Sequence, residues 1–149
     1  MNTQHVNYDE HLAEHFTLRE MVNSYLARTM HIDNTPTPEA VQNLRQLCQK
    51  VLEPLRQHFG PIGVNSGYRS PRLNELLGGV ANSQHMKGQA ADLYCRSLSD
   101  ARRLFDYARQ HVDFDQLLLE RRFTDGCCWL HVSYVGTGRN RRMARFLRV

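Results

Sequence analysis

Hydrophobic residues recur with two different periods along this chain, and the two periods occupy different parts of it. Up to about residue 77 they recur mainly at helical spacing, apart from a short strand-like run at residues 62–65. After residue 90 they form short runs typical of strands, at residues 90–95, 116–120 and 129–134. One more helical pattern starts at Ser97 or Ser99. Helices that gather ahead of strands favour an α+β fold over alternating β-α-β units. The last two runs flank a loop that contains Thr124-Asp125-Gly126, so we expect them to form an antiparallel hairpin.

Capping residues mark where the first three helices begin. Thr17-Leu18-Arg19-Glu20 is a capping box, and both Thr37-Pro38 and Ser70-Pro71 place a cap residue before a proline at the first helical position. Pro54 falls inside the apolar stripe of the second helix, so we expect it to kink or split that helix. The residues expected to face inward are Leu18, Met21, Val22, Tyr25 and Leu26 in the first helix, Val41, Leu44, Cys48, Val51, Leu52, Leu55 and Phe59 in the second, and Leu73, Leu76 and Leu77 in the third.

Length and composition predict one ordinary domain. With 149 residues, of which 41% are hydrophobic and 23% charged, the chain can bury a core of its own. We expect residues 1–15 to be a loose arm and residues 16–149 to form the domain, which ends in a basic tail. No run approaches the roughly 20 apolar residues that span a bilayer, and the polar N-terminus has no apolar signal core. We therefore expect synthesis in the cytoplasm and reduced cysteines.

Arginine carries most of the net charge of +4, and the basic tail concentrates it. Such a tail attracts polyanions such as nucleic acid, anionic lipid or a cell-wall polymer, although a solvated surface explains it about as well. No aromatic residues interleave with these arginines in the manner of a single-strand nucleic-acid platform, so we expect no specific nucleic-acid partner. The arginines of the tail are Arg139, Arg141, Arg142, Arg145 and Arg148.

Two imidazoles and one carboxylate are placed where they could share a metal ion. His85 and Asp92 lie on either side of Gly88, and His131 lies in a later strand-like run. Two histidines and a carboxylate are a ligand set that catalytic zinc favours, because they leave a fourth position free for water. Asp92 lies in an apolar run, where an unpaired carboxylate is costly. A metal ion would remove that cost and so would an arginine, while His131 could equally be a polar surface residue beside Trp129.

Four motifs in the right order resemble the peptidase M15 family of zinc D-Ala-D-Ala carboxypeptidases and endopeptidases. The pattern Ser-x-His-x-x-Gly-x-Ala-x-Asp runs from Ser83 to Asp92 and is followed by a Trp-x-His strand that starts at Trp129. Upstream, Ser66-Gly67-Tyr68-Arg69-Ser70-Pro71 matches a segment of that family. Residues 16–21 and 115–120 resemble its small, phage-associated or bacterial branch. The resemblance spans roughly residues 16–135, and it implies a hedgehog-like α+β fold with a small antiparallel sheet flanked by helices.

The resemblance also implies roles for individual residues. Arg69 matches the arginine that faces the scissile carbonyl or the substrate carboxylate, a task that suits a planar guanidinium. Ser83 matches a serine that hydrogen-bonds the carboxylate end of the substrate, and Tyr68 and Trp129 are further substrate-binding candidates within the same motifs. The residues that match the ligands of one zinc ion per chain are His85, Asp92 and His131.

The general base departs from the family pattern. Many relatives place a carboxylate three residues before the last zinc histidine, where this chain has Cys128, and a thiol is a poor substitute. Glu120 ends the strand that is expected to pair with the strand of that histidine, so we favour Glu120 as the base. Asp125 in the connecting loop fits a turn residue better. A surface ion pair with Arg121 or Arg122 would be a purely structural role for Glu120.

Together these expectations describe a zinc metallopeptidase that hydrolyses D-amino-acid-containing peptide bonds of peptidoglycan. It would be a D-Ala-D-Ala carboxypeptidase or an L-Ala-D-Glu-type endopeptidase, working as a monomer on stem peptides in the periplasm or cell wall. Release as a phage endolysin, or unusual export of a host enzyme, would deliver it there without a signal peptide. The alternative is a non-catalytic zinc module that binds cell-wall peptide or a protein partner, which Cys128 in the base position favours.

Overall fold

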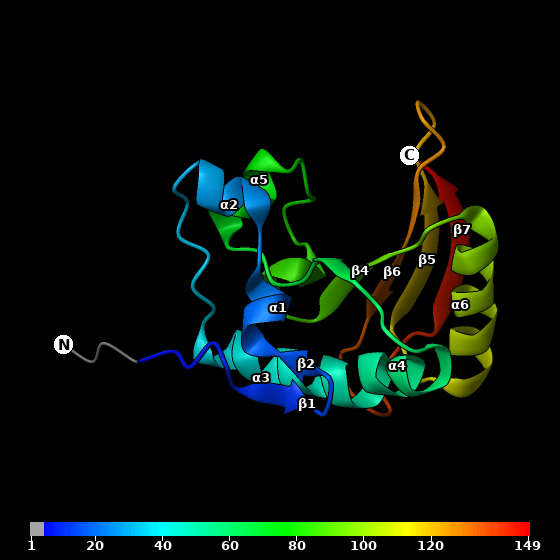
Figure 1. The fold of residues 1–149 in the computed structure, drawn as a ribbon, viewed down its shortest axis with the longest axis horizontal. Helices are drawn as coiled ribbons and strands as arrows, with labels where there is room; N and C mark the ends of the chain where they lie inside the picture. The colour runs from blue at the N-terminus through cyan, green and yellow to red at the C-terminus, as the bar shows by residue number, and fades with distance from the viewer. Residues whose placement is uncertain (1–4) are drawn as a thin grey trace.

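The computed structural model describes residues 5–149, in which a five-stranded sheet carries helix α6 against one side while the shorter helices α1, α2, α3 and α5 gather at the other end of the molecule (Figure 1). This is an α+β architecture, as the sequence predicts. The strands are β1 (His11–Ala13), β2 (Phe16–Thr17), β3 (Val64–Ser66), β4 (Ala90–Tyr94), β5 (Gln116–Arg121), β6 (Cys128–Ser133) and β7 (Met143–Arg148). The helices are α1 (Leu18–Val22), α2 (Tyr25–Thr29), α3 (Pro38–Leu47), α4 (Glu53–Phe59), α5 (Pro71–Leu76) and α6 (Leu98–His111), with a π-helical turn η1 (Cys48–Leu52) and a 3-10 turn η2 (Gln84–Lys87).

The main sheet has the strand order β3-β4-β6-β5-β7. Its neighbouring strands are antiparallel, including the predicted hairpin of β5 and β6, except for the parallel pair of β5 and β7. Because side chains alternate along a strand, each strand presents one face to α6 and one face to the opposite side. The face beneath α6 belongs to the core, where Leu93, Leu117 and Leu130 are all 0% exposed. The opposite face carries Asp92 and His131, which are register partners.

A long helical segment with an irregular turn fills the core beside the sheet. α3 begins after Thr37, whose hydroxyl accepts the Ala40 N–H at 3.1 Å, and its buried stripe continues through η1 into α4. η1 directly precedes Pro54, which lies in the first turn of α4. Proline has no N–H to donate to the preceding turn, so the wider π turn accommodates it without ending the helical segment. The interruption predicted at Pro54 is therefore confirmed.

Short helices depart from the predicted inward faces. Two helices replace the single helix predicted near the N-terminus, because Ser24 caps α2 and turns Tyr25 to solvent with 75% of its surface exposed. Leu76 and Leu77, which we predicted to face inward, are each 45% exposed, whereas Leu73 in the same helix is buried. A helix of five or six residues makes too few turns for periodicity to fix its buried face.

Both ends of the described chain join the fold. The first four residues of the predicted arm 1–15 lie outside the described range, but His11–Ala13 pairs with β2 and buries Leu12. The predicted basic tail contains β7, which extends the main sheet along β5. Residues 11–13 of the arm thus pair with the fold, and residues 143–148 of the tail form an edge strand. Hydrophobic periodicity reports only local patterns, so it could not predict which strands these two segments pair with.

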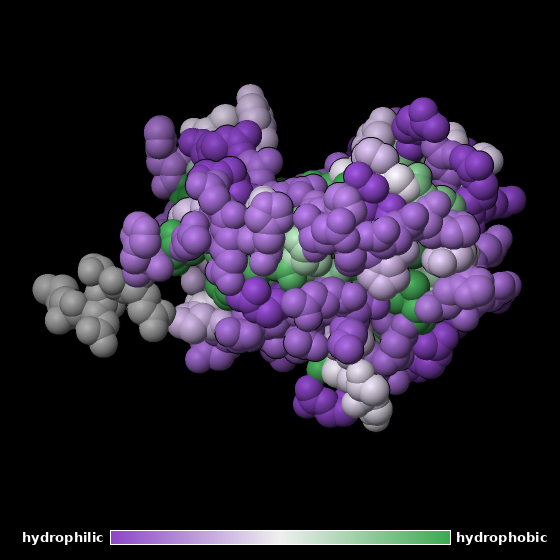
Figure 2. Space-filling view, turned by 60° about the horizontal axis from the view of Figure 1, so that its bottom comes forward, coloured by the Kyte–Doolittle hydropathy of each residue, from purple (hydrophilic) through white to green (hydrophobic). Residues whose placement is uncertain are grey.

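The surface is mainly hydrophilic, with small hydrophobic areas between polar side chains on the face seen in Figure 2. This agrees with a composition in which 23% of residues are charged. Within residues 5–149, no helix is both long and apolar enough to cross a membrane.

Candidate metal centre

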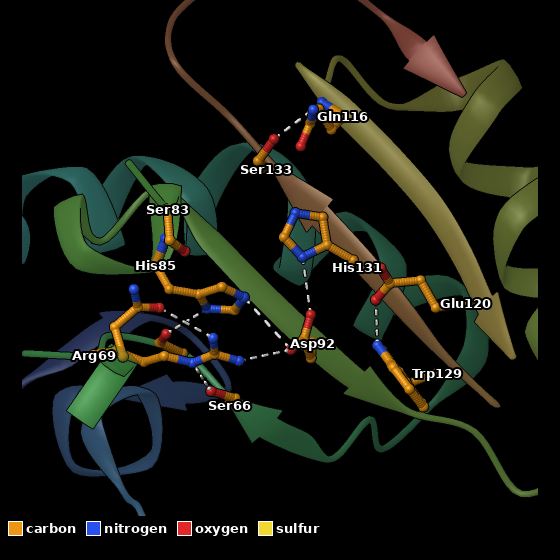
Figure 3. Close-up of polar contacts among 12 residues, drawn as sticks. Ser66, Arg69, Ser83, His85, Asp92, Gln116, Glu120, Trp129, His131 and Ser133 are labelled. Carbon is orange, nitrogen blue, oxygen red and sulfur yellow. Dashed lines mark hydrogen bonds and ion pairs between the residues drawn. The ribbon is translucent and has the colours of Figure 1, made fainter. Parts of the chain in front are cut away.

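β4, β6 and the turn η2 bring the three predicted ligands together at the sheet face opposite α6 (Figure 3). Asp92 and His131 are register partners, and His131 Nδ1 lies 2.9 Å from Asp92 Oδ1. His85 comes from η2 and places its Nε2 3.4 Å from Asp92 Oδ2. One potential ligand atom from each residue lies within 4.8 Å of the other two. The side chains singled out by sequence are thus one cluster, and their role as ligands stays a prediction.

Local contacts hold the His85 ring in one orientation. Ser83 caps η2, with its Oγ accepting the His85 backbone N–H at 3.2 Å, and Gly88 ends the turn with a φ of 72°. His85 Nδ1 lies 2.7 Å from the carbonyl oxygen of Gly67. Since a carbonyl only accepts hydrogen bonds, Nδ1 carries the proton, and Nε2 of the neutral ring keeps a free lone pair. That lone pair faces Asp92, as a metal-binding histidine requires.

Arg69 reaches the Asp92 carboxylate from the β3 side of the cluster. It donates from Nη2 to Asp92 Oδ2 at 3.2 Å, from Nε to Ser66 Oγ at 2.9 Å and from Nη1 to Asn74 Oδ1 at 3.4 Å. These contacts fix the guanidinium beside the cluster, where its side chain is 14% exposed. The arginine that the sequence allowed as a partner for Asp92 is therefore present together with the two imidazoles.

Asp92 is ionised in this setting. Burial alone would raise the pKa of its carboxyl, but the imidazoles of His131 and His85 beside it outweigh burial and hold the pKa well below its usual range. An ionised carboxylate beside two imidazoles supplies the negative charge that a divalent cation requires.

Glu120 lies on the same sheet face and has Trp129 as its register partner. Trp129 Nε1 donates a hydrogen bond to Glu120 Oε2. Burial raises the pKa of the Glu120 carboxyl above its ordinary value, and the charge of Asp92 adds to this rise, although His131 and the Trp129 bond oppose it. A carboxylate with a raised pKa suits a general base that works near neutral pH.

The alternatives to Glu120 lie away from the cluster. Asp125 is 52% exposed in the hairpin loop, where it accepts the Cys127 N–H at 2.9 Å and pairs with Arg122 at 2.9 Å, as a turn residue does. Cys128 is 6% exposed on the opposite face, because strand alternation turns it away from the last histidine of the cluster. Among the salt bridges of residues 5–149, none joins Glu120 to an arginine. The Cys128 thiol therefore does not face the cluster, where a general base would act.

The predicted substrate-binding residues are placed unequally. Ser83 is 8% exposed, and its hydroxyl already serves as the cap of the His85 turn. Trp129 is half-buried on the face of the cluster, with the Arg122 guanidinium 5.4 Å from its ring centre. Tyr68 is 4% exposed and packs in the hydrophobic core. Its ring anchors this segment to the core, and substrate contact by Tyr68 stays a prediction.

Some contacts that build the site could not be seen in the sequence. The carbonyl of Gly67 orients His85, and a Cβ at Gly67 would lie 2.2 Å from the carbonyl oxygen of Met21. Asp115 is 2% exposed and accepts hydrogen bonds from Gln84 Nε2 at 2.9 Å and Arg141 Nη2 at 2.7 Å. Gln84 immediately precedes His85, so this clasp ties the His85 turn to β5. Of these features, the sequence indicated only Gly67, as part of the motif that starts at Ser66. Glycine is required there because two backbone segments that approach so closely leave no room for a Cβ.

The donor set defines a class of site. Two imidazole nitrogens and one carboxylate oxygen within 4.8 Å fit a zinc-like divalent ion, with a coordination position left over for a small ligand. Fold and site together describe an α+β protein with a centre of the metallohydrolase type.

Comparison with known proteins agrees with this class. Residues 14–133 match the family model of peptidase M15, so the chain belongs to the peptidase M15 family. A similar curated protein, the zinc D-Ala-D-Ala carboxypeptidase of Streptomyces albus G, is 50% identical over 44 residues. This alignment covers 28% of the present chain and 17% of that relative, so the chain spans well under two thirds of the relative's length.

Proposed function

We propose that this protein is a zinc peptidase that hydrolyses D-amino-acid-containing peptide bonds in the stem peptides of peptidoglycan. The observation that carries the proposal is the convergence of His85, Asp92 and His131 on one sheet face that also presents Arg69 and Glu120. Membership of the peptidase M15 family supports a peptidase, and the name of the Streptomyces relative supports zinc and this substrate class. The reaction would be that of a D-Ala-D-Ala carboxypeptidase or an L-Ala-D-Glu-type endopeptidase.

His85, Asp92 and His131 would hold one zinc ion per chain. When bound, zinc polarises a carbonyl and lowers the pKa of water from 15.7 to roughly 7. The donor atoms are already gathered, and the Gly67 carbonyl already directs the His85 lone pair toward them. Binding the ion therefore requires little rearrangement of these side chains.

The remaining residues of the site would bind and move protons. Glu120 accepts a proton from the attacking water and passes it to the amine that leaves as the amide C–N bond breaks. Trp129 orients the Glu120 carboxylate through its indole N–H. Arg69 has five N–H donors, so those that Asp92 does not use can face the oxyanion or the substrate carboxylate. Ser83 is the further candidate for binding the carboxylate end of the substrate.

The setting of the reaction follows from the substrate. A peptidase of this kind would act as a monomer in the periplasm or cell wall, in the manner of an endolysin. Positive charge would favour its approach to an anionic wall, since the net charge is +4. Cys128 no longer favours the alternative of a non-catalytic zinc module, because its side chain lies on the other face of the sheet.

Metal analysis tests the centre itself. Wild-type protein that is loaded with zinc and then dialysed should retain one equivalent, whereas His85→Ala should retain almost none at the same free zinc concentration. Cys127→Ser is a suitable control, because Cys127 is an exposed thiol that could bind zinc without belonging to the site. Equal zinc in wild type and His85→Ala would refute the centre.

Glu120→Gln distinguishes the peptidase from the binding module. The amide keeps the size of the side chain but cannot serve as a base, so turnover of a D-Ala-D-Ala peptide and of purified peptidoglycan should fall about 10²–10⁴-fold at unchanged zinc content. Asp125→Asn, which removes a carboxylate from the hairpin loop, should keep wild-type turnover. Turnover that survives in Glu120→Gln would overturn the assignment of the base. Full zinc content without any turnover in wild type would favour the module.

A further inference from the structure

The sheet face that carries the metal centre continues beyond it toward β7. Register partners point to the same side of a sheet, so one row of side chains crosses the strands at the level of the centre. The side chains become more exposed along the row, from partly buried at β4 to exposed at β7. A molecule that is held at the centre and extends toward β7 therefore meets the last side chain of the row. From β4 to β7, the row consists of Asp92, His131, Leu118 and Arg145.

Arg69 and Arg145 lie on opposite sides of the centre. Arg69 approaches Asp92 from the side of β3, as Figure 3 shows, whereas Arg145 belongs to β7 at the other edge of the sheet. Two strand spacings of ~4.8 Å place the Cα of Arg145 about 10 Å from the Cα of His131. An extended peptide covers ~10 Å in about three residues. Arg69 and Arg145, one on each side of the centre, can thus contact opposite ends of one short peptide.

Unlike Arg141 and Arg142, Arg145 has no side-chain partner among the residues that the structure describes. Arg141 and Arg142 form ion pairs with aspartates of the segment 113–115. Arg148 belongs to the same strand but points to the other face, because it lies an odd number of residues from Arg145. Across residues 5–149, no hydrogen bond or ion pair holds the Arg145 guanidinium. Its planar set of N–H donors is free to bind a carboxylate in bidentate fashion.

We infer that Arg145 binds a carboxylate of the substrate about three residues from the scissile bond, on the side of the centre away from Arg69. The inference rests on the proposed function and narrows it to peptides that carry an acidic residue at this distance. Stem peptides that contain D-Glu supply such a carboxylate. β7 lies beyond residues 14–133, so this contact is contributed by a strand outside the segment that matches the family.

Two peptides that differ in one carboxylate test the inference. Both end in D-Ala-D-Ala, and they carry either Glu or Gln three residues before the scissile bond. Zinc-loaded wild type should favour the Glu peptide about fivefold in kcat/KM, the factor that corresponds to ~1 kcal/mol for an exposed ion pair. Arg145→Gln should abolish this preference without changing kcat/KM for the Gln peptide. Arg148→Gln removes the same charge from the other face of β7, so it should keep the preference.

Equilibrium binding separates failure of this inference from failure of the proposed function. Trp129 is the only tryptophan of the chain and lies on the binding face, so its fluorescence can follow titration with the same two peptides. If wild type cleaves neither peptide but binds the Glu peptide about fivefold more tightly, and Arg145→Gln does not, then the carboxylate site stands and the peptidase proposal fails. Equal affinity of wild type for both peptides, or equal losses in both arginine variants, would overturn the inference.

The pH profile distinguishes binding from an effect on the base. Leu118, the register partner of Arg145, lies two residues from Glu120 on β5, so Arg145 and Glu120 are diagonal neighbours on one face. If Arg145→Gln moves the acid limb of kcat by the same amount with both peptides, then Arg145 acts through Glu120 and the inference is wrong. An unmoved acid limb, together with loss of the preference for the Glu peptide, supports a binding role.

Discussion

Asp115 is a buried carboxylate outside the metal centre, and its replacement should produce a stability loss with a defined pH dependence. Its side chain is 2% exposed and accepts hydrogen bonds from the backbone and guanidinium N–H groups of Arg141 and from the Gln84 amide. These bonds, those of the Arg141 side chain foremost, outweigh burial and lower the pKa of Asp115 from 3.8 to about 2.

The size of the effect follows from this difference in pKa. A carboxyl whose pKa falls from 3.8 in the unfolded chain to about 2 in the folded protein contributes about 2 kcal/mol to the free energy of unfolding at neutral pH. Because the folded pKa is the lower one, this stabilisation is present above about pH 4 and disappears as the pH falls toward 2. Asp115→Asn cannot titrate. The free energy of unfolding of this variant should therefore be lower than that of wild type by about 2 kcal/mol at pH 7, by about half of that at pH 3, and by less at still lower pH. We call this difference the deficit.

Urea unfolding followed by Trp129 fluorescence measures this deficit at each pH. Any pH-independent cost of the amide side chain cancels when the deficits at two pH values are subtracted. Asp113→Asn is the matched control, because Asp113 pairs with Arg142 at 3.4 Å while the two side chains are 39% and 48% exposed. An exposed pair of this kind is worth at most about 1 kcal/mol. A deficit of Asp115→Asn that is the same at pH 7 and pH 3, or that the control reproduces, would refute the reasoning.

Two further substitutions test the geometry of the metal centre. Trp129→Phe removes the indole donor that lowers the pKa of Glu120. The acid limb of kcat/KM in the zinc-loaded enzyme should therefore move to higher pH. An acid limb that stays at the same pH would contradict this role of Trp129. Gly67→Ala places a Cβ 2.2 Å from the Met21 carbonyl oxygen and displaces the carbonyl that orients His85. We expect it to lower the free energy of unfolding by roughly 1–3 kcal/mol and to weaken zinc binding about 10–100-fold in a chelator competition; wild-type values in both measurements would show that the segment relaxes freely.

The starts of the helices could be predicted because capping is local. Thr17, Thr37, Ser70 and Ser97 each accept the backbone N–H of the residue three positions later, and each was a candidate cap in the sequence. The buried faces of the shortest helices were harder to predict. Tyr25 fits a helical stripe with its neighbours, but a new cap between them rotates it into solvent. Periodicity assumes one continuous helix, and this assumption fails where two caps lie close together.

The candidate site illustrates a different limit. The residues of the cluster could be predicted because the motifs contain them. The role of Cys128, three residues before His131, was instead inferred from family spacing alone, which takes no account of the direction of its side chain. Strand alternation would have placed Cys128 on the face opposite His131, and the predicted hairpin would have placed Glu120 beside Trp129. The pairing of β7 with β5 had no such signal, because its arginines resemble those of a solvated tail.

The three predicted ligands differ in how firmly the fold holds them, and this difference identifies the part of the structure that governs metal affinity. Asp92 lies between Ala91 and Leu93, both 0% exposed, so the core beneath the sheet fixes the direction of its side chain. His85 instead comes from a four-residue turn that a serine cap, the Gly67 carbonyl and the Asp115 clasp hold in place. Substitutions beneath the sheet should therefore lower global stability, whereas substitutions around the turn should also lower zinc affinity by moving His85 alone.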